Sequence, residues 1–126
     1  MTAATILVVD DDPVSLSLVE NVLGVEGYET RTATTPMQAL QILSTWNPDV
    51  ILLDIQFQGL DNGLEFARRL KSNVATRATP IVAFTAYGDR WSEAETRAAG
   101  CDAFLEKPIT AKMVADAVRA ALERTT

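Results

Sequence analysis

The sequence lacks histidine altogether and contains a single cysteine, Cys101. Without histidine, the chain cannot build a Ser-His-Asp or Cys-His catalytic site, a histidine-ligated metal centre or a phosphohistidine. One cysteine cannot form an internal disulfide, and a thiolate zinc site requires several. We therefore expect Cys101 to be a small buried residue, and any chemistry must come from other side chains.

Long apolar runs and an excess of positive charge are also missing. The first apolar run, Ile6–Val9, is followed at once by three aspartates, so it predicts neither a signal peptide nor a membrane-spanning helix, which needs about 20 apolar residues. The 11 Lys and Arg residues against 17 Asp and Glu give a net charge of −6, which argues against nucleic acid as a direct partner. We expect a soluble cytoplasmic protein that binds neither membranes nor nucleic acid.

An alternation of strand and helix patterns runs through the 126 residues, of which 48% are hydrophobic. The length, with no linker or internal repeat, predicts one domain over residues 1–126. Continuous apolar runs predict strands that are covered on both faces. The predicted strands are Ile6–Val9, Val50–Leu53, Ile81–Phe84 and Ala103–Leu105, with a weaker one at Tyr28–Ala33.

A segment with helical spacing follows each predicted strand. The five helices are expected from Pro13 to about Gly24, from Thr35-Pro36 to before Asn47, and over about 63–71, 92–99 and 110–124. The first helix carries a broad apolar stripe made of Val14, Leu16, Leu18, Val19, Val22 and Leu23. Five such units predict an open, mostly parallel α/β sheet with helices on both sides.

Ligands of such sheets bind beyond the carboxyl ends of the strands, so the residues just after each strand are the candidates for function. Asp10 and Asp11 follow the strand at 6–9, and Asp54 follows the strand at 50–53. Clustered carboxylates without histidine or thiolate suit a hard cation, and Mg²⁺ is the expected metal. Asp12 is instead well placed to cap the helix that begins at Pro13.

Two further polar residues follow the later strands. Lys107 comes after the strand at 103–105 and can supply a positive charge to a phosphoryl group. Thr85 comes after the strand at 81–84 and is either a helix cap or a hydroxyl donor to such a group. An aspartate nucleophile, a divalent cation, a lysine and a threonine hydroxyl together make a phosphoryl-transfer site, where attack on phosphorus gives an aspartyl phosphate.

Four short motifs resemble the signatures of the response-regulator receiver (CheY-like) family. They are Val8-Val9-Asp10-Asp11, Leu52-Leu53-Asp54-Ile55, Phe84-Thr85-Ala86 and Lys107-Pro108, in the family's order and across essentially the whole chain. The resemblance implies a doubly wound five-stranded parallel sheet of strand order 2-1-3-4-5 with five helices. It also implies a stand-alone switch in two-component or phosphorelay signalling rather than an enzyme, with self-catalysed phosphorylation and dephosphorylation only.

The resemblance also assigns roles to single residues. Asp54 would be the phosphoacceptor, Lys107 would contact the phosphoryl group, and Thr85 with Phe104 would form the switch. The Mg²⁺ ligands would be Asp10, Asp11, Asp54 and the backbone carbonyl of Gln56. The output face would be formed by the helix at 92–99, the strand at 103–105 and the helix at 110–124.

The partners implied are a sensor histidine kinase or a histidine phosphotransfer protein, and a downstream protein that the sequence does not identify. The chain would be a monomer or a phosphorylation-dependent dimer. Kinase specificity is expected on the first helix, around Val14 to Leu18, and on the loop after the last strand. In the loop after Asp54 the sequence departs from the family, since Gln58 stands in place of a proline and Asn62 looks inserted before Gly63. Tyr87 is expected to shield the phosphoryl group from water.

Three alternatives remain on the residues alone. Asp10-x-Asp12 is also the pattern of haloacid-dehalogenase-type phosphatases, although Pro13 and the short chain argue against that family. A receiver-shaped module that never uses phosphate and a flavodoxin-like FMN protein share the topology. Among the other residues, Trp46 is expected to pack and Trp91 to be partly exposed, while Arg68, Arg69 and Lys71 are expected on a solvated helix face.

Overall fold

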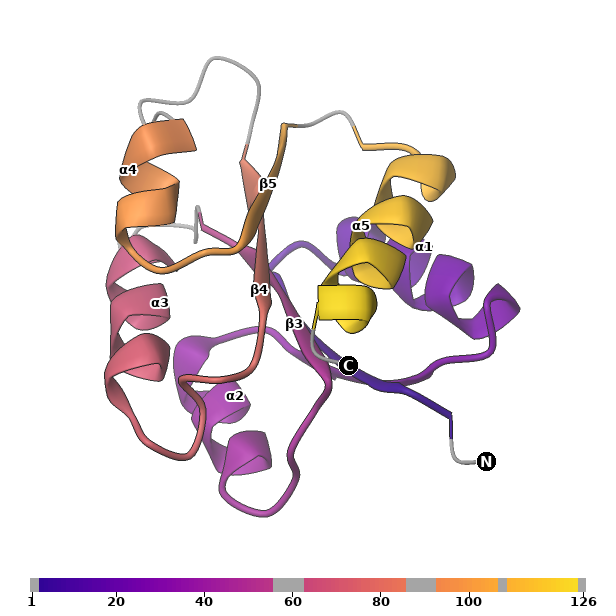
Figure 1. The fold of residues 1–126 in the computed structure, drawn as a ribbon. Helices are drawn as coiled ribbons and strands as arrows, with labels where there is room; N and C mark the ends of the chain where they lie inside the picture. The colour runs from indigo at the N-terminus through magenta and orange to yellow at the C-terminus, as the bar shows by residue number, and fades with distance from the viewer. Residues whose placement is uncertain (1–2, 56–62, 86–92, 107–108, 125–126) are drawn as a thin grey trace.

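The computed structural model describes residues 3–55, 63–85, 93–106 and 109–124 (Figure 1). Strands and helices alternate along this part of the chain, as the sequence predicts. The strands are β1 (Thr5–Val9), β2 (Glu29–Ala33), β3 (Val50–Asp54), β4 (Ile81–Thr85) and β5 (Ala103–Glu106). The helices are α1 (Pro13–Val25), α2 (Pro36–Leu43), α3 (Gly63–Ser72), α4 (Glu93–Ala98) and α5 (Ala111–Arg124).

The five strands form one parallel sheet in the order β2-β1-β3-β4-β5, which confirms the predicted fold. β1 lies between β2 and β3, so that Val9 is level with Ala33 on one side and with Leu53 on the other. β3 pairs in turn with β4, where Asp54 is level with Phe84. The carboxyl ends of β1, β3 and β4 therefore meet along the same edge of the sheet.

Helices cover both faces of the sheet, with α1 and α5 on one face and α2, α3 and α4 on the other (Figure 1). Alternate residues of each central strand enter the two cores: Leu7 packs with the α2–α3 side, whereas Ile6 and Val8 pack with α1 and α5. All three are fully buried, which explains why these strands read as continuous apolar runs. No helix in the described ranges is long and apolar enough to cross a membrane.

Only part of the apolar stripe predicted for α1 is buried in the structure. Leu16, Val19 and Leu23 are buried against the sheet, but 75% of Val14 and 47% of Leu18 are exposed. A single helix turns only one side toward a sheet, so a stripe this broad leaves some of its apolar residues outside. Val14 and Leu18 are therefore the part of the predicted stripe that stays exposed.

Polar caps start the first two helices as predicted. The Asp12 carboxylate accepts a hydrogen bond from the Val14 backbone N–H at 3.0 Å, and the Thr35 hydroxyl oxygen accepts one from the Gln38 N–H at 3.1 Å. A proline follows each cap at the first helical position, where its missing N–H costs nothing.

The solvated face predicted for α3 is correct for Arg68 and Arg69, which are exposed, and wrong for Lys71. The Lys71 ammonium group donates to the carboxylate of Asp102 at 3.1 Å and to the carbonyl of Thr79 at 2.9 Å. The same Asp102 carboxylate accepts the Ile81 N–H at 2.9 Å. Lys71 thus ties the end of α3 to the amino ends of β4 and β5.

Cys101 and Trp46 behave as the sequence predicts. Cys101 is buried beside the α3–α4 core, and this burial raises the pKa of its thiol from 9.0 to about 12, with Asp102 adding to the shift and Lys71 opposing it. Trp46 packs against the same core, and the guanidinium carbon of Arg31 lies 4.5 Å from its ring centroid. Trp91 lies outside the described residues.

Candidate functional site

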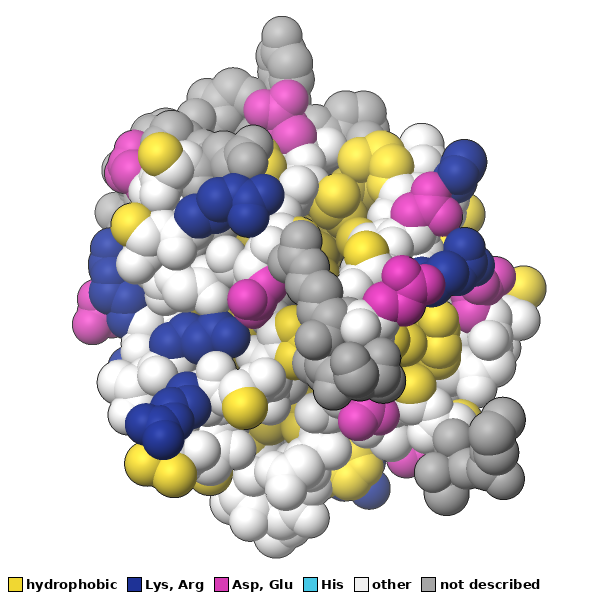
Figure 2. Space-filling model, in the orientation of Figure 1, with side chains coloured by type: hydrophobic (Ala, Val, Ile, Leu, Met, Phe, Trp, Pro, Cys, Tyr) yellow, Lys and Arg dark blue, Asp and Glu magenta, His cyan; other side chains and the backbone are white. Residues whose placement is uncertain are grey.

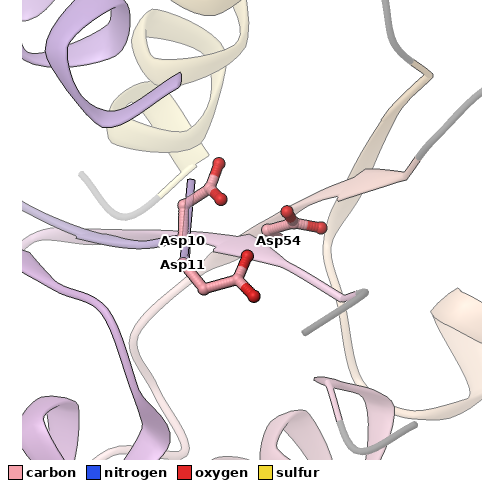
Figure 3. A group of neighbouring side chains, drawn as sticks. All are labelled: Asp10, Asp11 and Asp54. Carbon is pink, nitrogen blue, oxygen red and sulfur yellow. The ribbon is translucent and has the colours of Figure 1, made fainter. Parts of the chain in front are cut away.

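Three aspartates meet at the carboxyl ends of β1 and β3 (Figure 3). Asp10 and Asp11 directly follow β1, and Asp54 is the last residue of β3. Because Val9 of β1 is level with Leu53 of β3, the residues that follow them, Asp10 and Asp54, lie side by side at the same edge of the sheet. The strand register therefore brings together residues that are far apart in the sequence.

The carboxylates of Asp10, Asp11 and Asp54 are close enough to share one cation. One oxygen of each lies within 4.8 Å of the corresponding oxygens of the other two. Asp10 is only 1% exposed and Asp54 only 4%, whereas Asp11 is half-buried. The cluster therefore sits in the sheet edge and is reached from solvent on the side of Asp11.

Backbone hydrogen bonds hold the two strand ends in place. The Asp10 N–H donates to the Ala33 carbonyl at 3.0 Å, which extends the β1–β2 pairing by one residue. The Asp10 carboxylate accepts the Asp12 N–H at 2.9 Å. On β3, the Ile55 N–H donates to the Phe84 carbonyl at 3.0 Å and fixes the residue that follows Asp54.

This donor set fits a small hard cation. Carboxylate oxygens are preferred ligands of Mg²⁺, which keeps several waters when it binds to proteins. A divalent cation would also offset the mutual repulsion of three carboxylates held this close together. Such an ion supplies charge neutralisation for a phosphoryl group that is being transferred.

Asp12 takes no part in the cluster. Its carboxylate caps α1 through the Val14 N–H and also accepts the Ser15 hydroxyl at 3.1 Å. A haloacid-dehalogenase-type phosphatase would use Asp10 as nucleophile with the Asp12 carboxylate beside it. In the structure the Asp12 carboxylate is engaged in the cap of α1, which argues against this alternative.

Several predicted site residues lie outside the described part of the chain. These are Gln56, Lys107 and the side chain of Thr85, together with Gln58, Asn62 and Tyr87. The backbone of Thr85 is described: it ends β4, one residue beyond the Phe84 that pairs with Asp54. Phe104 lies in β5, level with Ala83, and is half-buried.

One residue of this edge was missed as a site component by the sequence reasoning. Gly63, which the sequence marks only as the end of a loop, begins α3 and lies against the backbone of Ile55. The signal was a glycine at the first position of a predicted helix, where most other residue types favour the helix more.

Comparisons with known proteins agree with this geometry. Residues 6–119 match the response regulator receiver domain family. The chain belongs to this family. It is a signalling switch of two-component systems rather than a classical enzyme, and receiver domains interact with histidine kinases and downstream effectors and generally bind Mg²⁺.

Individual relatives cover nearly the whole receiver. The polar-differentiation response regulator DivK of Brucella ovis is 30% identical over 118 residues, which span 94% of this chain and 95% of DivK. The chemotaxis response regulator CheY4 of Vibrio cholerae superposes with a TM-score of 0.86 at 27% identity, over 96% of this chain and all of CheY4. NtrX of Brucella abortus reaches a TM-score of 0.89 at 34% identity over 98% of this chain, which corresponds to 28% of NtrX.

Proposed function

We propose that this receiver, residues 1–126, accepts a phosphoryl group on Asp54 from a phosphohistidine of a sensor kinase or histidine phosphotransfer protein. The observation that carries the proposal is the meeting of Asp10, Asp11 and Asp54 within 4.8 Å at one sheet edge. Mg²⁺ would be held by these three carboxylates and by the backbone carbonyl of Gln56. A cytoplasmic location, expected from the sequence, is part of the same proposal.

The proposed chemistry is a displacement at phosphorus. A carboxylate oxygen of Asp54 forms the new P–O bond while the P–N bond to the donor imidazole breaks, and the imidazole keeps the electron pair and takes up a proton. Lys107 would offset charge on the phosphoryl oxygens. Hydrolysis, in which water attacks the same phosphorus, releases inorganic phosphate and returns the Asp54 carboxylate.

The output is proposed to run through β4 and β5. Thr85 ends β4 beside Asp54, and β5 carries Phe104 as the next strand of the sheet. A half-buried aromatic ring can turn inward or outward at modest cost, so Phe104 is suited to report a movement of Thr85. The face formed by α4, β5 and α5 would then change its affinity for a downstream protein or for a second phosphorylated copy.

The phosphodonor protein is proposed to dock on α1. Val14 and Leu18 are exposed, and α1 begins at Pro13, directly after the aspartates of the site. The apolar surface continues through Val22 and Val25 into a groove of about 460 Å³ between α1 and α5. Figure 2 shows hydrophobic side chains exposed among charged ones on the side of the molecule where these helices lie.

The test of the phosphoacceptor is the mass of the intact protein after incubation with Mg²⁺ and acetyl phosphate. We expect one phosphoryl group on the wild type, none without Mg²⁺ and none on Asp54→Ala. Asp12→Asn is the matched control, because asparagine still caps α1 and the residue lies outside the cluster. Asp12→Asn should be phosphorylated like the wild type.

Other outcomes would redirect the assignment. A phosphoryl group that persists on Asp54→Ala would move the acceptor to another residue. A wild type that neither binds Mg²⁺ nor gains mass would favour a module that works without phosphate. A wild type that binds Mg²⁺ but gains no mass would require a protein phosphodonor, which the same assay can supply.

A further inference from the structure

The first residue of α3 touches the backbone of the strand end that carries Asp54. A Cβ atom built on Gly63 would overlap the Cα, carbonyl carbon and carbonyl oxygen of Ile55. The position therefore needs glycine because there is no space for a side chain. Every other residue type would place an atom inside the Ile55 backbone.

Neither partner of this contact has room to move away. The Ile55 side chain is fully buried, and its N–H is bonded to the Phe84 carbonyl at 3.0 Å. On the other side, α3 is held against the sheet by the buried side chains of Leu64 and Phe66. The contact between Gly63 and the Ile55 backbone therefore sets how closely the start of α3 approaches the end of β3.

We infer that Gly63 is a positioning residue for the phosphorylation site. The inference rests on the proposed function, in which Asp54 and the carbonyl of Gln56 are both Mg²⁺ ligands. Asp54 directly precedes Ile55 in the chain, so a displacement of the Ile55 backbone moves the Asp54 carboxylate away from Asp10 and Asp11. Coordination at near-ideal octahedral geometry tolerates such a movement poorly.

The substitution Gly63→Ala tests this role. Mg²⁺ affinity is measured by titration with MgCl₂, followed through backbone amide NMR shifts, and the phosphorylation rate is measured with acetyl phosphate. Supporting residues around metal ligands typically contribute about 10–100-fold to affinity, so we expect Mg²⁺ to bind Gly63→Ala at least about 10-fold more weakly. The phosphorylation rate should fall by up to about 100-fold, the usual cost of a shift near 1 Å at a reacting group.

Gly100→Ala is the matched control for lost stability. Gly100 has a φ of +104°, and a Cβ there would meet the Lys71 side chain, so this substitution is also strained. It lies at the amino end of β5, at the opposite edge of the sheet from the aspartates. Gly100→Ala should lower the melting temperature and leave Mg²⁺ affinity and phosphorylation rate unchanged.

The results separate this inference from the proposed function. If the wild type fails to bind Mg²⁺, or is phosphorylated neither by acetyl phosphate nor by a phosphohistidine protein, the proposed function is wrong. Suppose that the wild type does both, and that Gly63→Ala has the same Mg²⁺ affinity and phosphorylation rate but a lower melting temperature. The helix α3 has then shifted instead of the end of β3, and the positioning role is refuted.

A second variant decides the case if Gly63→Ala does not fold. Ile55→Val shortens the buried side chain of Ile55 and leaves its backbone contact with Gly63 intact. If the backbone contact positions the site, Mg²⁺ affinity of Ile55→Val should equal that of the wild type. A loss of about 10-fold in this variant would show that side-chain packing positions the strand end, and would refute the role of Gly63.

Discussion

Replacing Lys71 with methionine should destabilise the protein far more than replacing an exposed lysine in a shorter ion pair. Lys71 is 21% exposed and its ammonium group bonds to Asp102 at 3.1 Å and to the Thr79 carbonyl at 2.9 Å. Methionine keeps the apolar stem and removes only the charge and its donors. Lys71→Met therefore isolates the polar contacts of this side chain.

The magnitude follows from burial. A hydrogen bond to a charged group contributes about 1.5–3 kcal/mol. Lys71 makes two such bonds in partly buried surroundings, and its third bond, to the Arg77 carbonyl at 3.3 Å, is exposed and adds little. In the variant, the Asp102 carboxylate still accepts the Ile81 N–H, and because it is 35% exposed, water can solvate its free positions. This solvation offsets part of the lost stability. We expect Lys71→Met to lower the free energy of unfolding by about 2 kcal/mol, or the melting temperature by roughly 8 °C in a chain of this length.

Lys112→Met is the control. Its ammonium group lies 2.7 Å from the Asp116 carboxylate, closer than in the Lys71 pair, but Lys112 is 82% exposed. Exposed pairs of this kind contribute little to stability, because solvent and salt screen them. Urea unfolding of both variants compares them directly, and a loss in Lys112→Met equal to that in Lys71→Met would refute the argument that burial rather than distance sets the contribution.

Two further predictions concern Cys101 and α1. Burial raises the pKa of the Cys101 thiol from 9.0 to about 12, so between these values the thiol stays neutral in the folded state and ionises in the unfolded chain. The free energy of unfolding should therefore be unaffected by this group below pH 9 and fall between pH 9 and pH 12. Measured by urea unfolding relative to Cys101→Ala, the loss should reach at most about 1.4 kcal/mol per pH unit, and identical pH profiles would contradict it. For α1, a double variant with Val14→Asn and Leu18→Asn should slow phosphoryl transfer from a phosphohistidine protein and leave phosphorylation by acetyl phosphate unchanged. The control Val74→Asn, at an equally exposed valine far from the site, should leave both rates unchanged. If the double variant accepts a phosphoryl group from the phosphohistidine protein as fast as Val74→Asn does, α1 is not the docking site.

The strands and the acidic cluster were predictable because they depend on local patterns. Apolar runs mark buried strands, and parallel strands that share an edge bring their following residues together. The two rules mark Asp10, Asp11 and Asp54 as strand-end residues, and the strand order implied by the family resemblance brings them together. The caps at Asp12 and Thr35 follow from residue type and a proline next in sequence.

The contacts of Lys71 and Gly63 were not predictable in this way. A lysine near the end of an amphipathic helix is usually solvated, and the partners of Lys71 lie in the loop before β4 and just before β5. Likewise, nothing local to Gly63 shows that Ile55 will lie against it. Both depend on the distance between elements after packing, which composition and periodicity do not contain.

The two edges of the sheet differ in their charges: like charges gather at the carboxyl edge, and an ion pair lies at the amino edge. At the carboxyl edge, three carboxylates lie within 4.8 Å of one another, and a bound cation would offset their mutual repulsion. At the amino edge, Lys71 and Asp102 attract each other and bind backbone groups of the same loops. Because charges at opposite edges interact weakly through solvent and salt, the proposed phosphorylation of Asp54 would change the charge at one edge without loosening the contacts that hold α3 to β4 and β5. Mg²⁺ should therefore raise the melting temperatures of the wild type and Lys71→Met by the same amount, and a smaller rise in the variant would show that the two edges are coupled.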